Sequence, residues 1–272
     1  MIPLKFGLFW SGSKLSALRF LTFVSLRKHH PNAEITLYLS KKSDKNVSWG
    51  VEKQDFQCFS GDSCYLDKLD DLNVKVVEAE LFPTYAPNFQ SDLFRWWWIY
   101  NNGGFYLDTD QIILKPFDDL PLDADIIYSM YRAESCGIYS PVGVIGAKQK
   151  GNIVGEIMNN MSDCYDPNNY NSLGPFMFRD LYFKNREKWN EENVMFNAPP
   201  NYFYPFAESR LITKAYTTNI HLTGEAYALH WYGGHPMSQE FNNKFSEESC
   251  LTDEDTISKL AKPLFKWYKE NR

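Results

Sequence analysis

Two aspartates, Asp108 and Asp110, close the apolar segment "GGFYLDTD" (103–110), and their spacing could serve a metal ion. Because side chains alternate along a strand, Tyr106, Asp108 and Asp110 would share one face, with the aspartate Cα atoms roughly 6–7 Å apart. Two carboxylates at one strand end can hold a hard divalent cation that keeps open positions for water and phosphate oxygens. The segment therefore predicts a metal site for a phosphate-bearing ligand.

A second charged pair, Asp92 and Arg95, lies in the helix expected just before that strand. At about 100° per residue, Asp92, Arg95 and Asn102 fall on one narrow stripe of the helix. The three tryptophans at 96–98 span about 200° of its circumference, which is too wide for the apolar stripe of a surface helix. We expect a helix packed on several sides and ended by the glycines of "NNGG" (101–104), with Arg95 placed to clamp an anionic or hydroxyl-rich group.

The spacing D-x-D is not diagnostic by itself, because it occurs three times in this chain. The pair at 253/255 is typical of a solvated helix start, and the pair at 123/125 follows "DDLPL" in an expected turn. Only the pair at 108/110 ends an apolar segment behind a Gly-Gly turn and a charged helix stripe. Its context favours a ligand site over a carboxylate pair that is satisfied by turn amides.

The whole stretch "SDLFRWWWIYNNGGFYLDTD" (91–110) resembles the signature of the DXD-containing sugar transferases of GT-A fold. That group includes the yeast initiation-specific mannosyltransferases and the clostridial large-toxin glucosyltransferase domains, with the pattern S-D-x-x-R, a helix, then G-G-x-Y-x-D-x-D. The matching positions are Ser91, Asp92, Arg95, Gly103, Gly104, Tyr106, Asp108 and Asp110. The resemblance implies an α/β, Rossmann-type mixed central sheet flanked by helices in a single domain, 1–272. Residues 1–116 would mainly bind the nucleotide sugar, and 117–272 would supply the acceptor side and site closure.

Two further segments are similar to parts of that family. "FWSG" (9–12) is similar to its strand-end F/V-W-x-G, in which the tryptophan stacks on the nucleotide base. This similarity nominates Trp10, with Phe9 and Gly12 beside it. "SLGPFMF" (172–178) resembles a Thr-Gly-Pro segment near the acceptor, although Ser172 and Leu173 stand where threonine is expected.

A late segment, "ALHW" (228–231), is similar to the family's His-x-W or His-His-W stretch near the metal and pyrophosphate. It nominates His230 and Trp231. The family often continues to Gly-Ser-Trp, whereas this chain has "YGGHP". The third metal ligand is therefore either His230, which we favour, or His235. His221, on an expected strand, is assigned a structural role.

The function implied by the resemblance is a metal-dependent, retaining glycosyltransferase. It would move a hexose from a nucleotide-diphosphate sugar, UDP-hexose first and GDP-mannose second, to a hydroxyl of a glycan or glycolipid. Asp108, Asp110 and His230 would hold Mn²⁺ or Mg²⁺, and Asp92 and Arg95 would contact sugar hydroxyls. The other donor contacts are assigned to Phe9, Trp10, Gly12, Tyr106 and Trp231.

Two other classes of protein compete with this interpretation. Haloacid-dehalogenase-like phosphatases also end a strand in D-x-D and use the first aspartate, here Asp108, as nucleophile. Their motif usually lies near the N-terminus, and the lysine and paired acidic motifs that should follow are not evident here. The third class is a catalytically inactive carbohydrate-binding module, against which the intact charged set argues.

The composition indicates a soluble globular protein, with 272 residues, 44% apolar and 23% charged. A net charge of −6 provides no global basic field for nucleic acid. Five cysteines without a C-x-x-C pair favour reduced thiols over a zinc ribbon. The apolar run in "MIPLKFGLFWSG" is too short for a signal peptide or a membrane span, so we expect a cytoplasmic protein.

Hydrophobic periodicity predicts a strand–helix–strand opening and a single domain. Residues 41–73 are expected to be a loop-rich insertion and 82–89 an irregular link. Strands are expected at 4–10, 33–40, 74–80, 103–117, 123–132, 141–149 and 227–235. Helices are expected at 14–30, 91–102, 152–165, 174–189 and 252–272.

The predicted C-terminal helix combines basic and apolar residues and contains Pro263, which would kink it. A solvated helix docked on the protein explains this composition. Peripheral contact with a membrane that holds a glycolipid acceptor is the second interpretation.

Overall fold

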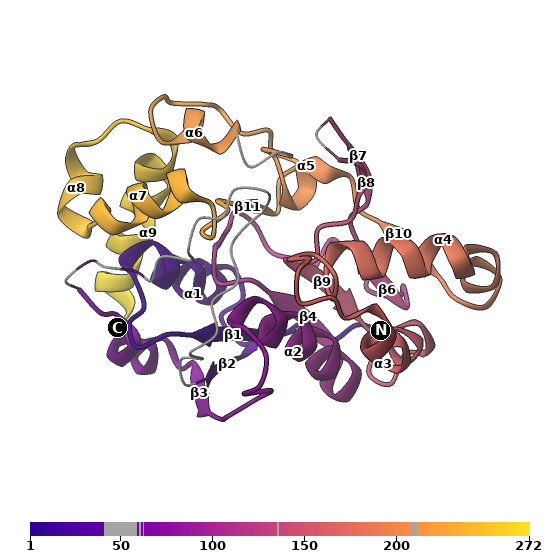
Figure 1. The fold of residues 1–272 in the computed structure, drawn as a ribbon. Helices are drawn as coiled ribbons and strands as arrows, with labels where there is room; N and C mark the ends of the chain where they lie inside the picture. Colours follow the sequence, from indigo (N-terminus) through magenta and orange to yellow (C-terminus); the bar gives the residue numbers. More distant parts are fainter. Residues whose placement is uncertain (41–58, 60, 62, 135, 208–210) are drawn as a thin grey trace.

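The computed structural model describes residues 1–40, 59, 61, 63–134, 136–207 and 211–272 (Figure 1). Much of the predicted insertion at 41–73 lies outside these residues. The strands are β1 (Lys5–Ser11), β2 (Glu34–Ser40), β3 (Lys75–Glu78), β4 (Gly104–Leu107), β5 (Gln111–Ile113), β6 (Ile126–Tyr128), β7 (Tyr131–Ala133), β8 (Gly137–Tyr139), β9 (Val144–Ala147), β10 (Met195–Asn197) and β11 (Ala228–His230). The helices are α1 (Ala17–His29), η1 (Leu66–Leu72), α2 (Pro87–Asn102), α3 (Asn152–Cys164), α4 (Pro175–Glu192), α5 (Pro200–Phe203), α6 (Ile212–Ala215), α7 (Pro236–Lys244), α8 (Glu247–Thr252) and α9 (Thr256–Asn271).

Seven strands form one mixed sheet in the order β10-β6-β9-β4-β1-β2-β3. β1 pairs in parallel with both β2 and β4, β2 pairs in parallel with β3, and β10 pairs in parallel with β6. β9 runs antiparallel to its neighbours β4 and β6. The predicted strand–helix–strand opening and mixed α/β sheet are confirmed.

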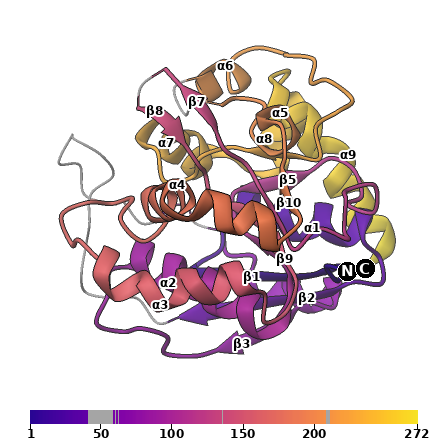
Figure 2. The same ribbon diagram turned by 90° about the vertical axis from the view of Figure 1, so that its right-hand side faces the viewer.

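Helices cover both faces of the sheet (Figures 1 and 2). Because side chains alternate along a strand, β4 contributes to two separate cores. Phe105 and Leu107 join the core that includes α1 and α9, whereas Tyr106 joins the core that includes α2, α3 and α4. Asp108 follows directly after this fully buried strand.

The tryptophans of α2 pack against different elements. Trp96 stacks on Phe178 of α4 with ring centroids 5.7 Å apart. Trp98 packs against β1 at Gly7, where a Cβ would lie 2.3 Å from the indole ring. The expected packing of this helix on several sides is confirmed. Since α2 begins at Pro87, the last three residues of the predicted link at 82–89 are helical.

The segment predicted as one strand over 103–117 is two strands in two sheets. β4 begins at Gly104. Gly103 and Gly104 have φ angles of +64° and +96°, a region of backbone conformation that favours glycine. β4 ends at Leu107, and residues 108–110 turn the chain away so that β5 can pair with β11. The prediction that Asp108 and Asp110 share a face by strand alternation is therefore wrong, because this turn sets their relative positions.

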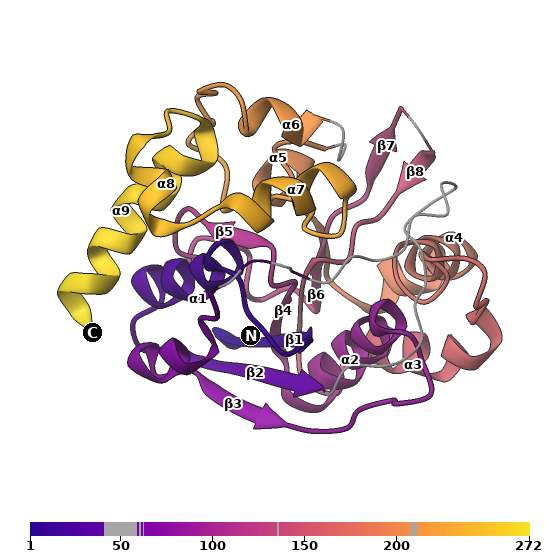
Figure 3. The same ribbon diagram turned by 60° about the vertical axis from the view of Figure 1, so that its left-hand side comes forward.

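Three other element predictions need correction. The strand predicted at 123–132 divides into β6 and β7, and β7 pairs with β8 in a hairpin that projects from the body (Figure 3). The strand predicted at 227–235 stops at His230, shortly before Tyr232, whose φ of +52° turns the chain. His221 is exposed and lies outside any strand.

The C-terminal segment forms α8 and α9, and α9 continues through Pro263. Its apolar residues Ile257, Leu264 and Phe265 are buried in the protein core. Lys259 and Lys262 pair with Glu254 at 3.0 and 3.1 Å. The helix is docked, as the first interpretation predicted, and peripheral membrane contact stays a prediction. No helix in the described part of the chain has both the length and the apolar composition needed to cross a bilayer.

The contact between Gly7 and Trp98 holds α2 against the sheet and can be tested by adding one methyl group. Gly7→Ala would force that methyl into the indole, and we expect it to lower the free energy of unfolding by about 1–3 kcal/mol. Gly224→Ala is the matched control, because a Cβ there meets nothing within 4 Å. Urea denaturation of both variants measures the difference, and equal stabilities would contradict the packing described here.

Candidate active site

A pocket of about 600 Å³ opens at the carboxyl ends of β1 and β4. This edge is where open α/β sheets usually bind ligands, because loops from several strands converge there. The pocket is lined by residues from β1, α1, α2, the 108–110 turn, the β7–β8 region and the 230–234 segment. Its predicted members are Phe9, Trp10, Asp92, Arg95, Asp108, Asp110 and His230.

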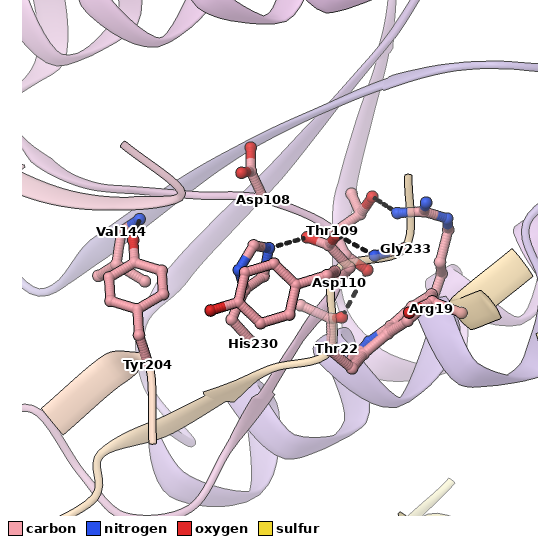
Figure 4. A network of polar contacts seen from close by, with 12 residues as sticks. Arg19, Thr22, Asp108, Thr109, Asp110, Val144, Tyr204, His230 and Gly233 are labelled. Carbon is pink, nitrogen blue, oxygen red and sulfur yellow. Dashed lines mark hydrogen bonds and ion pairs between the residues drawn. The ribbon is translucent and has the colours of Figure 1, made fainter. Parts of the chain in front are cut away.

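Asp108, Asp110 and His230 converge at this pocket (Figure 4). One ligand atom from each lies within 4.8 Å of the others. The antiparallel pairing of β11 with β5 sets His230 opposite Gln111 and so brings the imidazole to Asp110. Trp231 extends this pairing, since its backbone N–H donates to the backbone carbonyl of Asp110 at 3.0 Å.

Asp110 is buried, and each of its oxygens has a different neighbour. Oδ2 accepts a hydrogen bond from the N–H of Gly233 at 2.6 Å, and Oδ1 lies 3.1 Å from Nε2 of His230. Burial raises the pKa of Asp110, but His230, Arg19 and the Gly233 amide outweigh burial and hold that pKa well below its usual range. Asp110 is therefore a carboxylate at neutral pH.

The chemistry of this cluster suits a divalent cation. Nδ1 of His230 is buried without a hydrogen-bond partner among the described residues, while Nε2 of the same ring is the neighbour of Oδ1 of Asp110. A buried acceptor without a partner is costly unless a ligand satisfies it. Two carboxylates suit a hard divalent cation such as Mn²⁺ or Mg²⁺, and an imidazole can complete its coordination. Asp108, Asp110 and His230 could thus hold the metal predicted from the sequence.

Helix α1 fixes the 108–110 turn from one side (Figure 4). The hydroxyl of Thr22 donates to the carbonyl of Thr109 at 2.8 Å. Nη1 of Arg19 donates to the Thr109 hydroxyl at 2.7 Å. One helix therefore positions both the backbone and the side chain between the two aspartates.

The Tyr106 hydroxyl holds the Asp108 carboxylate in place. Its hydroxyl donates to Oδ1 of Asp108 at 2.6 Å and lies 2.8 Å from the Ser91 hydroxyl. The Asp108 N–H donates to the carbonyl of Gly143 at 2.8 Å. A Cβ at position 143 would lie 2.7 Å from Oδ2 of Asp108, so glycine there leaves room for the carboxylate.

Arg95 lies between two carboxylates. Its Nη2 is 2.9 Å from Oδ1 of Asp92 and 3.5 Å from Oδ1 of Asp108, and its Nη1 donates to the carbonyl of Val142. Burial raises the pKa of Asp92 to about 7, Arg95 opposes this shift, and Asp108 reinforces it. The predicted polar stripe of α2 is thus a buried ion-pair cluster at the pocket.

The segment before α4 reaches the same cluster. A Cβ at Gly174 would lie 2.7 Å from Oδ1 of Asp92, so the chain passes close to this carboxylate just before α4 begins at Pro175. Asn171 and Pro175 line the pocket, whereas Ser172 and Leu173 are buried. The segment that resembled the family's acceptor region therefore lies beside Asp92.

Three predicted donor contacts do not line the pocket. Tyr106 and Trp231 are fully buried, and Gly12 lies against the edge of the Trp10 indole. His235 caps the start of α7, and its Nδ1 accepts from the N–H of Met237. His230, the favoured histidine, is the one brought to the two aspartates.

The sequence analysis missed Arg19, which lines the pocket with only 7% of its surface exposed. The available signal was a charged residue inside the apolar run "SALRFLTF" (16–23) of a helix that proves buried nearly all round. Tyr139, Tyr170 and Tyr232 also line the pocket and carried no motif.

Fold and site together define a glycosyltransferase of the GT-A type. Two glycosyltransferase family models match successive parts of the chain. Residues 20–127 match the family described as glycosyltransferase sugar-binding region containing DXD motif, and residues 146–252 match the alpha 1,4-glycosyltransferase conserved region. These matches favour a glycosyltransferase over the phosphatase. No curated protein sequence gives a significant match.

Three solved structures with a similar arrangement are glycosyltransferases. PaToxG glycosyltransferase is 19% identical, with 70% of this chain and 72% of that chain covered and a TM-score of 0.47. Apo GlyE of Streptococcus pneumoniae TIGR4 is 12% identical, with 98% and 60% covered and a TM-score of 0.47, so this chain spans about three fifths of GlyE. The galactosyltransferase LgtC, solved with donor and acceptor sugar analogs, is 12% identical, with 98% and 96% covered and a TM-score of 0.45.

The hydroxyl of Tyr106 can be tested as the group that orients Asp108. Tyr106→Phe keeps the buried ring and removes the bond to Asp108, and we expect Mn²⁺ affinity to fall about tenfold, as for other groups that orient metal ligands. Isothermal titration with Mn²⁺ measures the effect. Tyr100→Phe, at a partly buried tyrosine of α2 that does not line the pocket, is the control. Equal affinity for Mn²⁺ in both variants would rule out the orienting role.

Proposed function

We propose that this protein is a metal-dependent, retaining glycosyltransferase that moves a hexose from a nucleotide-diphosphate sugar to a hydroxyl of a glycan or glycolipid. The observation that carries the proposal is the cluster of Asp108, Asp110 and His230 within one pocket. A divalent cation held there would act as a Lewis acid toward the departing diphosphate.

A continuous series of contacts supports the orientation of the donor. The Arg19 guanidinium lies over Trp10, 4.3 Å from the ring centroid, and also bonds Thr109 between the metal-site aspartates. At the other end, Arg95 joins Asp108 to Asp92. We place the base at Trp10, the diphosphate at the metal site, and the sugar at Asp92 and Arg95.

The acceptor side would come from the second half of the chain. Tyr139 from β8 and Asn171 and Pro175 from the start of α4 line the pocket beside Asp92. They adjoin the sugar end of the proposed donor site, where an acceptor hydroxyl must approach the anomeric carbon. Residues 1–116 would then bind mainly the donor, and 117–272 mainly the acceptor.

The distribution of carboxylates supports reaction on one face of the sugar. Among the described residues that line the pocket, the carboxylates are Asp92, Asp108 and Asp110. Two belong to the metal cluster, and Asp92 is paired with Arg95. None is left for a covalent glycosyl intermediate, so we assign retention to attack by the acceptor on the face from which the diphosphate leaves.

The contribution of Asp110 can be tested without knowing the acceptor. Asp110→Asn removes a metal-binding charge, and we expect release of UDP from a UDP-hexose to fall about a thousandfold, as several kcal/mol of charge stabilisation are lost. The Mn²⁺-dependent part of nucleotide binding should be lost as well. Asp123→Asn, at the exposed first aspartate of another D-x-D pair, is the control. Full activity of Asp110→Asn, or of the native protein in EDTA, would overturn the proposal.

The donor is UDP-hexose in our proposal, with GDP-mannose second. A tryptophan platform accepts either base, so the preference needs a direct assay. Hydrolysis of a panel of nucleotide sugars in the presence of Mn²⁺ should be fastest with a UDP-hexose. Faster turnover of GDP-mannose would reverse the assignment of the base and leave the metal chemistry intact.

A further inference from the structure

Arg19 lines the pocket, where its guanidinium contacts two indole rings and the metal-site turn. Its guanidinium lies 4.3 Å from the centroid of Trp10 and 5.1 Å from that of Trp231. The side chain comes from the buried helix α1 and is itself more than nine-tenths buried. A position on a packed helix fixes this charge far more firmly than a surface loop would.

Most of the hydrogen-bonding capacity of Arg19 is unused. A guanidinium carries five N–H donors, and within the described part of the chain this one donates a single side-chain hydrogen bond, to Thr109. It forms no ion pair with a carboxylate among the described residues. Because Arg19 lines the pocket, its remaining donors are available to an anionic ligand there.

Arg27, on the same helix, shows what a structural arginine looks like in this protein. It is also buried, but its guanidinium is surrounded by backbone acceptors. These acceptors are the carbonyls of His30, Pro31, Ala33, Leu72 and Asn73. Arg27 thus bonds the chain on several sides, whereas Arg19 leaves donors available at the pocket.

The charge of Arg19 is placed for an anion that also contacts the metal. A Cβ at Gly233 would lie 2.6 Å from Nη2 of Arg19, and the N–H of the same residue donates to Asp110. A cation held by Asp110 would therefore have the guanidinium as a close neighbour. Two positive charges side by side repel each other unless an anion with several oxygens lies between them.

We propose that Arg19 binds the diphosphate of the donor nucleotide and holds it against the metal site. This inference rests on the proposed function, because it assumes that a nucleotide diphosphate enters this pocket. Arg19 lies between Trp10 and the metal cluster, and a base stacked on Trp10 places its diphosphate at Arg19. The guanidinium supplies charge-assisted hydrogen bonds to phosphate oxygens and stabilises the leaving nucleoside diphosphate.

Arg19→Met tests this role, because methionine keeps much of the aliphatic length and removes the charge. With Mn²⁺ present, we expect UDP to bind about ten- to a hundredfold more weakly, the range expected for lost charge-assisted hydrogen bonds. Uridine, which has no phosphate, should bind within about threefold of its native affinity. The UDP affinity of Arg19→Lys should lie between those of the native protein and Arg19→Met, because lysine keeps the charge without the planar fork of the guanidinium. Isothermal titration measures all three, with GDP and guanosine as a parallel pair.

Two controls separate ligand binding from structural support. Lys14→Met removes a positive charge near the start of α1 that does not line the pocket, and it should leave UDP affinity unchanged. Arg27→Met should lower the thermal midpoint, because it leaves several carbonyls without their donor. Arg19→Met should lower the thermal midpoint less than Arg27→Met does, because it removes one side-chain hydrogen bond, to Thr109, instead of several. A loss of stability like that of Arg27→Met, with unchanged UDP affinity, would show that Arg19 is structural.

The outcomes distinguish this inference from the function on which it rests. Suppose that the native protein binds UDP or GDP with Mn²⁺ and that Asp110→Asn loses this binding. If Arg19→Met then keeps the nucleotide affinity within about threefold of the native value, only the proposed role of Arg19 is wrong. If the native protein binds neither nucleotide, or Asp110→Asn binds as well as the native protein, the proposed function fails and the role of Arg19 fails with it.

Discussion

The site depends on balancing three carboxylates that the fold gathers around one pocket. Asp92 and Asp108 share the single guanidinium of Arg95, and Asp110 has His230 and a backbone amide. Like charges buried together are unfavourable unless cations stand between them. The residues that surround the carboxylates, more than the carboxylates themselves, therefore decide which of them can receive a metal.

The fold solves this problem by placing the aspartates between two strands that belong to different sheets. β4 is anchored in the central sheet, whereas β5 pairs with β11. The turn between them leaves Asp108 partly exposed and buries Asp110 next to His230. On one side, α1 binds the turn through Thr22. Because residues from positions 19 to 233 converge on three turn residues, the site depends on contacts between distant parts of the chain.

The local part of this arrangement could be predicted from the sequence, and the long-range part could not. The spacing of Asp92, Arg95 and the two aspartates, together with the glycine turn, identified the cluster, although strand alternation was the wrong reason for the proximity of the aspartates. Burial of Tyr106 and Trp231 depends on which helices cover them, and one sequence without structure carries no such information. Arg19 was missed because a charged residue in an apolar helix looks the same whether it is satisfied or waiting for a ligand.

On the proposed assignments, these charges favour an order of binding. In the protein alone, the Arg19 guanidinium lowers the pKa of Asp110 and so helps to keep the metal-binding carboxylate ionised. Once a divalent cation binds Asp110, the same guanidinium faces a like charge, and only an anion restores the balance. A diphosphate meets both cations at once, so bound metal and Arg19 each strengthen its binding. After transfer, the nucleoside diphosphate carries more negative charge than the sugar nucleotide did, and the two cations that stabilise its departure also slow its release.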